Sequence, residues 1–393
     1  MSALGYPFAL AIILILGIGS LAVAARLRWW YRHFRSAGNL QQQTPQRWLQ
    51  LEISRLLLLG IVIIMVGMAV GATVWQRANN RSAFQAMQSR LRNSFDKNAV
   101  WQAPDWALLP GDPQRKLVAY GRDLVAHTTD YFGDKGLVRP HSINGLNCQN
   151  CHLEAGSKPF GNNYSGVAAN YPKMRARSGK MESVSYRIND CIQRSLNGSP
   201  LDTNSREMQA MIAYITWLGA NVPAKVSPKG VGLVDVPFLD RPADPALGAV
   251  VYTRSCASCH GPDGQGLPLP DSPRFYPPLW GDRSYAESAG LFRMSRLAGY
   301  VKANMPFGVN YLSPQLSDPE AWDVAAFINS QPRPGHRFLA EDWPDVSKKN
   351  FDHPFGPYAD PFPEQQHKYG PFQPILDFYK AKAAAVAQQS VKK

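Results

Sequence analysis

The sequence contains the motif Cys-x-x-Cys-His twice, and the thiols and imidazoles of this motif are chemically reactive groups. Two thiols three positions apart lie along one face of a turn, so both can form thioether bonds to the two vinyl groups of one haem. The adjacent histidine can then bind the iron. We therefore predict two covalently bound haem c groups. The residues that would hold them are Cys148, Cys151, His152, Cys256, Cys259 and His260.

Two other kinds of site use the same residue types. A zinc site would bring both cysteine pairs together in one place, and a thioredoxin-like redox pair rarely carries the trailing histidine in two copies. The copies start at residues 148 and 256, an offset of 108 that equals the length of a small domain. The spacing favours an internal duplication with one haem in each half.

Each iron needs a sixth ligand from further along the chain. In the second half Met305, followed by a proline, lies 45 residues after His260 and fits this role, with Met294 as its competitor. The first half breaks the pattern, because its methionines lack a following proline and two of them belong to a helix where core packing explains them better. They are Met174, Met181, Met208 and Met211.

Cys191 lies 39 residues after His152 and is the only cysteine outside the two motifs. A lone thiol in an oxidising compartment is open to oxidation, and the alternatives are a buried inert cysteine or an intermolecular disulfide. We predict instead a thiolate ligand on the first iron. Because an anionic sulfur stabilises ferric iron, the two haems should differ in potential and in role.

Basic residues dominate the sequence around Cys191, with six Lys or Arg against two acids, a local charge of +4. Such a cluster forms a solvated face or pairs with haem propionates, but guanidinium groups also bind small oxyanions through a planar fork. Next to a thiolate, the cluster therefore suits a small dianion. Its members are Lys173, Arg175, Arg177, Lys180, Arg187 and Arg194, opposed by Glu182 and Asp190.

Helical periodicity brackets each haem motif. Helices are predicted at residues 113–132 and 246–255 before the motifs, and at residues 207–218 and 319–330 after them. Between residues 331 and 374, nine prolines alternate with aromatic residues. This composition excludes a regular helix or a central strand and predicts a strap that packs over the domains.

Two uncharged stretches, residues 7–25 and 56–76, are each long enough to span a bilayer. The loop between them, residues 26–55, holds six arginines against one acid, which favours a cytoplasmic loop with both termini outside. A cleaved signal peptide is the alternative for the first stretch, but no positive charge precedes it. We expect a protein of the bacterial inner membrane with its haem domains in the periplasm. The chain has a net charge of +13. Its exported part nevertheless has no basic helix with interleaved aromatic residues, so nucleic acid is not an expected partner.

We predict a mostly α fold, with two fused class I cytochrome c domains behind a two-helix transmembrane hairpin and before a Pro- and aromatic-rich C-terminal strap. The predicted parts are the hairpin at 1–78, the first haem domain at 79–225, the second haem domain at 226–335, and the strap and tail at 336–393, ending in a frayed helix at 375–393.

Four stretches resemble the dihaem thiosulfate dehydrogenases. They are NGLNCQNCHLEAG at 144–156, YRINDCIQRSLNG at 186–198, NMPFG at 304–308 and HKYGPF at 367–372. The resemblance implies two cytochrome c domains that join two thiosulfate dianions into tetrathionate, in some members reversibly, and release two electrons. It also implies that His152 and Cys191 hold the catalytic haem, whereas His260 and Met305 hold the haem through which electrons leave.

The family's anion site corresponds to Arg177, Arg187 and Ser195 of this chain, and the resemblance implies the same role here. On that basis the arginines offset the repulsion between two dianions, and Cys191 forms a transient sulfur–sulfur bond to one thiosulfate. Two features depart from the family. Its members are commonly soluble, so the hairpin leaves the electron acceptor open among a cytochrome c, a membrane oxidase and quinone. Asn304 stands where some relatives have an iron-binding lysine, so Met305 is expected to be the ligand in both redox states.

Three rival functions share parts of this pattern. A non-enzymatic, membrane-anchored dihaem carrier serving a respiratory oxidase or dehydrogenase is favoured by the hairpin and disfavoured by Cys191. A dihaem peroxidase needs one iron with an open or readily vacated position. A sulfur-oxidation cytochrome that acts on protein-bound thiosulfate has the same His/Cys haem. Reduction of the haems by thiosulfate and turnover of peroxide are the discriminating tests.

Overall fold

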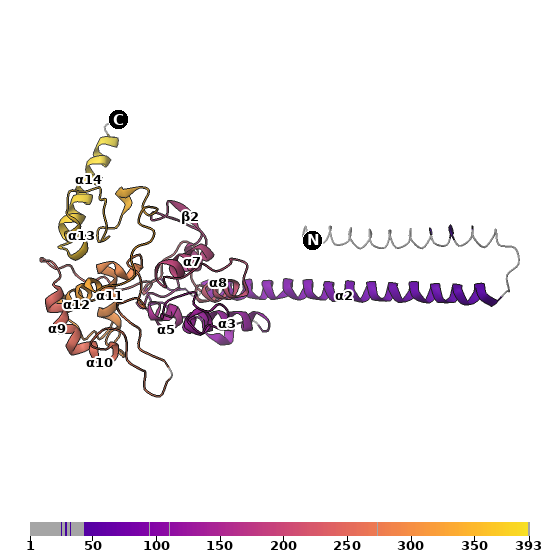
Figure 1. Ribbon diagram of the computed structural model, residues 1–393. Helices are drawn as coiled ribbons and strands as arrows, with labels where there is room; N and C mark the ends of the chain where they lie inside the picture. The colour runs from indigo at the N-terminus through magenta and orange to yellow at the C-terminus, as the bar shows by residue number, and fades with distance from the viewer. Residues whose placement is uncertain are drawn as a thin grey trace. The chain divides into compact units, whose positions relative to one another are not determined.

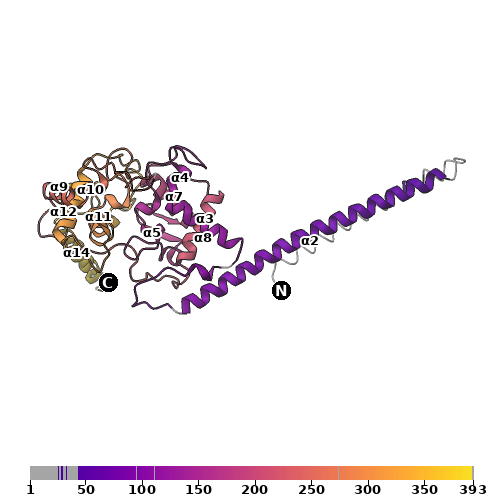
Figure 2. The same cartoon turned by 90° about the horizontal axis from the view of Figure 1, so that it is seen from below.

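The computed structural model describes residues 25, 28, 29, 32, 43–93, 95–109, 111–272 and 274–391. The chain forms two compact units, Met1–Asn79 and Asn80–Lys393. Its elements are drawn in Figure 1 and, from below, in Figure 2. Helices dominate the described residues, where the one sheet has two short strands, so the prediction of a mostly α protein is confirmed.

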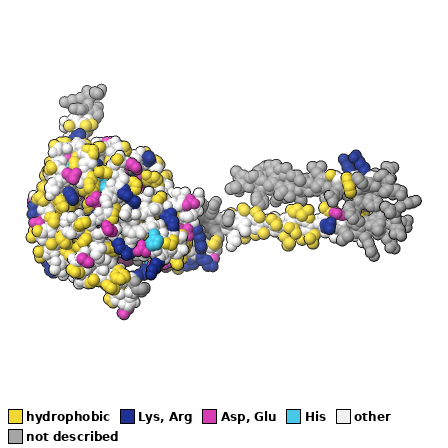
Figure 3. Space-filling model, viewed as in Figure 1, with side chains coloured by type: hydrophobic (Ala, Val, Ile, Leu, Met, Phe, Trp, Pro, Cys, Tyr) yellow, Lys and Arg dark blue, Asp and Glu magenta, His cyan; other side chains and the backbone are white. Residues whose placement is uncertain are grey.

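Helix α2, Gln43–Asn93, contains the longest apolar stretch of the described chain. Its segment Glu52–Gln76 has a mean hydropathy of 2.6 and exposed apolar side chains, so by length and composition it can cross a membrane. Hydrophobic side chains cover this stretch in Figure 3. The predicted span at 56–76 lies inside it. The predicted span at 7–25 falls outside the described residues apart from Ala25, so the two-helix hairpin is not confirmed.

Helix α2 is longer than predicted at both ends. It begins at Gln43, inside the loop predicted for residues 26–55, and it ends at Asn93, inside the predicted first haem domain. No proline follows Pro45 in this helix, and its polar last turns are rich in residues of good helix propensity. Without proline, and with residues of good helix propensity, a helix can continue where it has no apolar face. The length predicted from the hydrophobic pattern was therefore too short.

In its described residues, the first haem domain contains six α-helices and two short 3-10 turns. They are η1 Trp106–Leu108, α3 Gln114–Ala126, α4 Thr128–Phe132, η2 Cys148–Asn150, α5 Leu153–Gly156, α6 Val167–Asn170, α7 Val184–Arg194 and α8 Arg206–Leu218. Strands β1, Lys173–Arg175, and β2, Lys180–Glu182, pair antiparallel with Met174 opposite Met181. The predicted helices at 113–132 and 207–218 are confirmed, the first as two helices. Helix α7 was not among the predictions.

The second haem domain and the C-terminal region follow in the same unit. Their elements are α9 Pro245–Ser255, α10 Ala257–His260, η3 Gly290–Phe292, α11 Met294–Asn304, α12 Asp318–Ser330, η4 Val346–Lys348, α13 Glu364–Tyr369 and α14 Gln373–Val391. In both views α9 to α12 gather on one side of this unit and α3, α5, α7 and α8 on the other (Figure 1, Figure 2). The helices predicted at 246–255, 319–330 and 375–393 are confirmed.

The two haem domains repeat one helix crossing. Helix α3 packs against α8, and α9 packs against α12. A Cβ atom added to Gly121 would lie 2.0 Å from the carbonyl oxygen of Ala210, and one added to Gly248 would lie 1.9 Å from that of Asp323. Each crossing therefore needs a residue without a side chain. The matching close approaches identify the two halves as copies of one architecture.

The C-terminal strap, residues 331–374, packs over both haem domains as its aromatic content predicted. Phe372 packs against Trp322 of α12 in a tilted pair with ring centroids 5.4 Å apart, and Phe355 stacks on Phe292 of η3 at 5.8 Å. The backbone N–H of Trp343 donates to the carbonyl of Arg177 in the first domain at 2.6 Å. One expectation was wrong, because the strap contains the short helix α13. Pro363 is its N-cap residue, and the missing N–H of a proline costs no helical hydrogen bond at the start of a helix.

Candidate haem and anion site

A cavity of about 560 Å³ opens between the first haem domain, the second haem domain and the strap. Its lining includes two residues of the first haem motif together with the lone cysteine and the predicted anion-binding residues. They are Cys151, His152, Arg177, Arg187, Cys191 and Ser195. The fold thus brings six sequence-predicted residues into one space.

The ring of His152 is fixed with one nitrogen toward the protein. Its Nδ1 lies 2.5 Å from the carbonyl oxygen of Asn162, which requires Nδ1 to carry the proton, and Tyr164 stacks on the ring at 4.4 Å. Gly156, at φ 84°, makes room for this stack, because a Cβ atom there would lie 2.1 Å from the Tyr164 ring. Burial lowers the pKa of His152 to about 4, so the imidazole is neutral. A neutral ring with Nε2 free is the form that binds iron.

The thiols of the first motif fit covalent haem attachment. Burial raises the pKa of Cys148 to about 11 and that of Cys151 to about 12, so both are neutral. All five cysteines of the chain are described, and each is free of a disulfide. A thioether has no ionisable proton, so bonding to haem vinyl groups removes two buried titratable groups from an apolar site. The donor set is that of a c-type haem.

Helix α7 and its C-cap residue Ser195 place three of the predicted residues on one face. Arg187, Cys191 and Ser195 follow one another at intervals of four residues, which align along one side of an α-helix. The helix begins after Ser183, whose side chain accepts a hydrogen bond from the N–H of Tyr186 at 3.1 Å. The charge of a Cys191 thiolate is the main reason that the pKa of Arg187 is raised. This four-residue spacing is the sequence signal for α7 that hydrophobic periodicity did not give.

Arg177 comes from the turn between β1 and β2 and is held from several sides. Its Nε lies 3.9 Å from Oδ2 of Asp342, and its Nη1 donates to the carbonyl of Ser288 at 3.4 Å. Burial, followed by the charge of Arg194, lowers the pKa of Arg177 to about 10, and Asp342 opposes this. The guanidinium is still charged at neutral pH and presents its remaining donors to the cavity.

Further polar residues line the cavity from segments distant in sequence. The described lining contains seven cations and no carboxylate, so its field favours an anion. Lys173 and Arg175 belong to the cluster predicted around Cys191, whereas Lys180 and Arg194 of that cluster do not line the cavity. The lining residues that the sequence did not indicate include Arg293 and Arg296 of the second haem domain and Trp343, Lys348 and Asn350 of the C-terminal strap.

The second haem motif shows the same histidine arrangement as the first. Nδ1 of His260 lies 2.9 Å from the carbonyl oxygen of Pro277, which leaves Nε2 free. Met305 directly follows α11 and is partly buried against the core, whereas its competitor Met294 is a core residue with 2% of its surface exposed. In the first domain Met208 and Met211 are also core residues, as predicted. The exposed Met174 and Met181 pair across the two strands.

Helix α11 of the second haem domain contacts the region of the first haem motif directly. The hydroxyl of Tyr300 in α11 donates to the carbonyl of Asn150, inside the first haem motif, at 2.6 Å. Asn304 Nδ2 donates to the carbonyl of Phe160 at 3.0 Å, next to the loop that holds His152. The end of α11, directly before Met305, is therefore fixed against the first haem domain.

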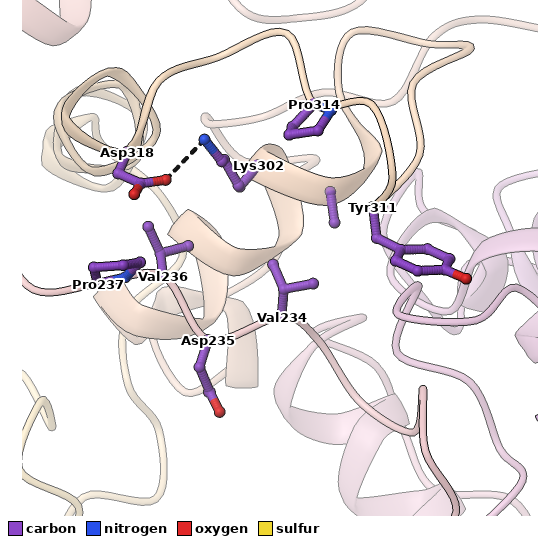
Figure 4. Close-up of a pocket in the computed structure, with 9 residues that line it drawn as sticks. Val234, Asp235, Val236, Pro237, Lys302, Tyr311, Pro314 and Asp318 are labelled. Carbon is purple, nitrogen blue, oxygen red and sulfur yellow. Dashed lines mark ion pairs between the residues drawn. The ribbon is translucent and has the colours of Figure 1, made fainter. Parts of the chain in front are cut away.

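A second, smaller cavity of about 140 Å³ has a different character. It lies between the segment Val234–Pro237 and the end of α11, as Figure 4 shows. Its one lysine, Lys302, forms an ion pair with Asp318 at 2.7 Å, and Asp235 adds a second carboxylate. Since acids balance its positive charge and no cysteine lines it, this cavity lacks the features of the anion site.

Comparison with known proteins identifies similar domains and relatives. A family model of the SoxA/TsdA cytochrome c domain matches residues 138–223, and a cytochrome c model matches residues 245–332. The thiosulfate dehydrogenase of Psychrobacter arcticus is 35% identical over 245 residues, which cover 62% of this chain and 71% of that protein. That of Allochromatium vinosum is 36% identical over 243 residues, which cover 59% and 83%.

A solved structure is also similar. The "as isolated" form of the thiosulfate dehydrogenase TsdBA from Marichromatium purpuratum matches with a TM-score of 0.54 and 31% identity, over 60% of this chain. The present chain covers 50% of that chain, so it spans half its length. Together with the two Cys-x-x-Cys-His motifs, these similarities show that the chain belongs to the thiosulfate dehydrogenase family of dihaem oxidoreductases, with two covalently bound haem c groups.

Proposed function

We propose that this protein joins two thiosulfate dianions into tetrathionate in the cavity beside Cys191 and passes the electrons out through the second haem domain. One observation carries the proposal: the cavity that contains Cys191, Arg177, Arg187 and Ser195 is lined by seven cations and by no described carboxylate. A neutral metabolite has no need of such a lining. The relatives named thiosulfate dehydrogenase support this choice of dianion.

The arginines reduce the electrostatic repulsion between the two substrate dianions. Two dianions repel each other, and inside a protein the repulsion is stronger than in water because the effective dielectric constant is lower. Arg187 faces Cys191 on α7, and Arg177 approaches from the strand turn, so two forks can hold an oxyanion near the sulfur. The hydroxyl of Ser195 adds a donor on the same face. These groups are in place before substrate binds, which is the condition for efficient electrostatic catalysis.

The sulfur chemistry balances in two steps. In the first, the Cys191 thiolate and one thiosulfate form a sulfur–sulfur bond, giving Cys191–S–S–SO₃⁻ and two electrons. In the second, another thiosulfate attacks the sulfur bonded to Cys191, the Cys191 thiolate leaves, and tetrathionate forms. The two haem groups, when bound, supply two one-electron acceptors for the first step. The reverse sequence consumes two electrons, so the same residues serve tetrathionate reduction.

We further propose His152 and Cys191 as the protein ligands of the first iron, and His260 and Met305 as those of the second. Cys191 lines the same cavity as His152, and Met305 is the methionine near the second motif that the core does not enclose. A thiolate at the first iron lowers its potential relative to a thioether. The reactive sulfur is therefore also the group that distinguishes the two haems.

The apolar segment of α2 supports a proposal for the location in the cell. We propose that α2 anchors the protein in the bacterial inner membrane, with the haem domains in the periplasm. The exposed apolar segment Glu52–Gln76 and the arginine-rich segment before it support this orientation. An anchored protein can deliver electrons to a membrane oxidase, to quinone or to a cytochrome c.

The proposal is tested by the absorption spectrum of the oxidised, membrane-extracted holoprotein before and after anaerobic addition of thiosulfate. We expect the haems of the parent to become reduced, and those of a Cys191→Ala variant to stay oxidised. If thiosulfate reduces neither protein and tetrathionate does not reoxidise the reduced parent, the proposal is wrong.

A second candidate function is a membrane-anchored dihaem electron carrier, and the apolar segment of α2 favours it. A carrier needs no reactive sulfur in a cavity and no cationic lining next to it. The same experiment separates the two functions, because a carrier accepts electrons from a reduced partner protein but not from thiosulfate.

A further inference from the structure

The arginines of the anion site are connected by a row of alternating charges. Nη1 of Arg187 donates to Oδ2 of Asp190 at 2.6 Å, and Nε of Arg194 bonds to the other oxygen of Asp190. Both terminal nitrogens of Arg194 donate to the two oxygens of Asp342 at 2.7 Å each. Asp342 in turn faces Nε of Arg177 at 3.9 Å. The row begins and ends at a guanidinium that lines the cavity.

Arg194 is the centre of this row and does not touch the cavity. Its side chain is 11% exposed, and its guanidinium lies 4.5 Å from the ring centroid of Phe338 in the C-terminal strap. All three of its nitrogens are bonded to carboxylates of the row. These bonds use three of its five N–H donors, and Arg194 does not line the cavity, so an anion held there does not contact it and an effect of Arg194 on thiosulfate acts through Arg187 and Arg177.

The row ties together three segments that local structure does not hold at a fixed spacing. Arg187 is on α7, Arg177 is in the turn after β1, and Asp342 belongs to the strap, 148 positions from Arg194. Beside Asp342, the N–H of Trp343 donates to the carbonyl of Arg177 at 2.6 Å. The planar fork of Arg194 can hold a carboxylate bidentately, which sets its orientation as well as its distance.

Building on the proposed function, we propose that Arg194 is a positioning residue for the thiosulfate site, because its fork sets the distance between the two substrate-facing arginines, Arg187 and Arg177. When the distance between Arg187 and Arg177 is fixed before substrate binds, no binding free energy is used to order these two flexible side chains. The strap is then part of the anion site, since it supplies Asp342, the carboxylate that the Arg194 guanidinium binds.

The test compares Arg194→Lys with a matched control in the holoprotein. Lysine keeps the positive charge and loses the bidentate fork. Arg241→Lys is the control, because Arg241 also binds a buried carboxylate with two bonds, to Asp323 at 2.9 and 2.7 Å, but neither residue lines the cavity. KM and kcat for thiosulfate, the haem spectra and the midpoint of thermal unfolding are measured for the parent and both variants.

We expect Arg194→Lys to raise KM for thiosulfate about tenfold, equivalent to roughly 1.4 kcal/mol, with little change in kcat or in the haem spectra. Arg241→Lys should lower the unfolding midpoint and leave KM as in the parent. An unchanged KM in Arg194→Lys, or an equal rise in both variants, overturns the proposal. If Arg194→Lys does not fold, Asp342→Glu, which keeps the charge and shifts the carboxylate, is judged by the same criteria. A parent that shows no reaction with thiosulfate overturns the proposed function itself, and this inference with it.

Discussion

Replacing Arg187 by glutamine removes one of the two guanidinium groups that face the proposed substrate. A hydrogen bond to a charged partner contributes roughly 1.5–3 kcal/mol, which corresponds to a fall in kcat/KM of about 10- to 160-fold. Arg187 has one nitrogen engaged by Asp190 at 2.6 Å, so its remaining donors are the ones lost to the substrate. The effect should appear mainly in KM, because the arginine binds the anion before and during the reaction.

The structure indicates that this variant folds. Asp190 keeps its partner Arg194 when Arg187 is removed, so no carboxylate is left buried without a counter-charge. The loss of a partly exposed ion pair costs about 1 kcal/mol or less in the free energy of unfolding. The unfolding midpoint in denaturant should therefore change little, and a lower activity can be assigned to the site.

The assay is anaerobic thiosulfate oxidation with an artificial one-electron acceptor, at a fixed and low ionic strength. Lys180→Gln is the matched control: it removes one positive charge from the same cluster, but Lys180 is exposed and does not line the cavity. We expect the control to retain kcat/KM within about twofold, because a charge exposed to water is screened. Equal losses in both variants, or none in Arg187→Gln, would refute direct contact between Arg187 and thiosulfate.

Three further predictions concern stability. Gly121→Ala should lower the free energy of unfolding by roughly 1–3 kcal/mol, measured in denaturant, because its Cβ would overlap the Ala210 carbonyl at 2.0 Å. Burial, with help from nearby cations, lowers the pKa of His353 from 6.5 to about 3, so the unfolded state binds a proton that the folded state does not. Stability should therefore fall by roughly 1.4 kcal/mol per unit as pH drops from about 6.5 toward 3, relative to a His353→Gln variant that lacks this slope. Tyr300→Phe should cost about 1–3 kcal/mol in the same unfolding assay, since it leaves the Asn150 carbonyl without its 2.6 Å partner between the haem domains; an unchanged midpoint would show that this bond does not hold them together.

The sequence by itself determined the covalent chemistry of this protein. The spacing within Cys148–His152 and Cys256–His260 is fixed by the two vinyl groups and the iron of one haem, so it can be read without a fold. The four-residue interval between Arg187, Cys191 and Ser195 is likewise a local property, because one helix turn repeats every 3.6 residues. Helix positions on either side of each motif followed from the same short-range periodicity.

Only the tertiary structure decided how the anion site is completed and which charges belong to it. Arg293, Lys348 and Asn350 reach the cavity from segments more than 100 residues beyond Cys191, and no local pattern marks them. Arg194 lies in the same cluster as Arg187 but turns away to bond two carboxylates, one of which comes from the strap. The sequence does not distinguish an arginine that binds substrate from one that binds a carboxylate. The role of each arginine depends on which distant segment folds against it.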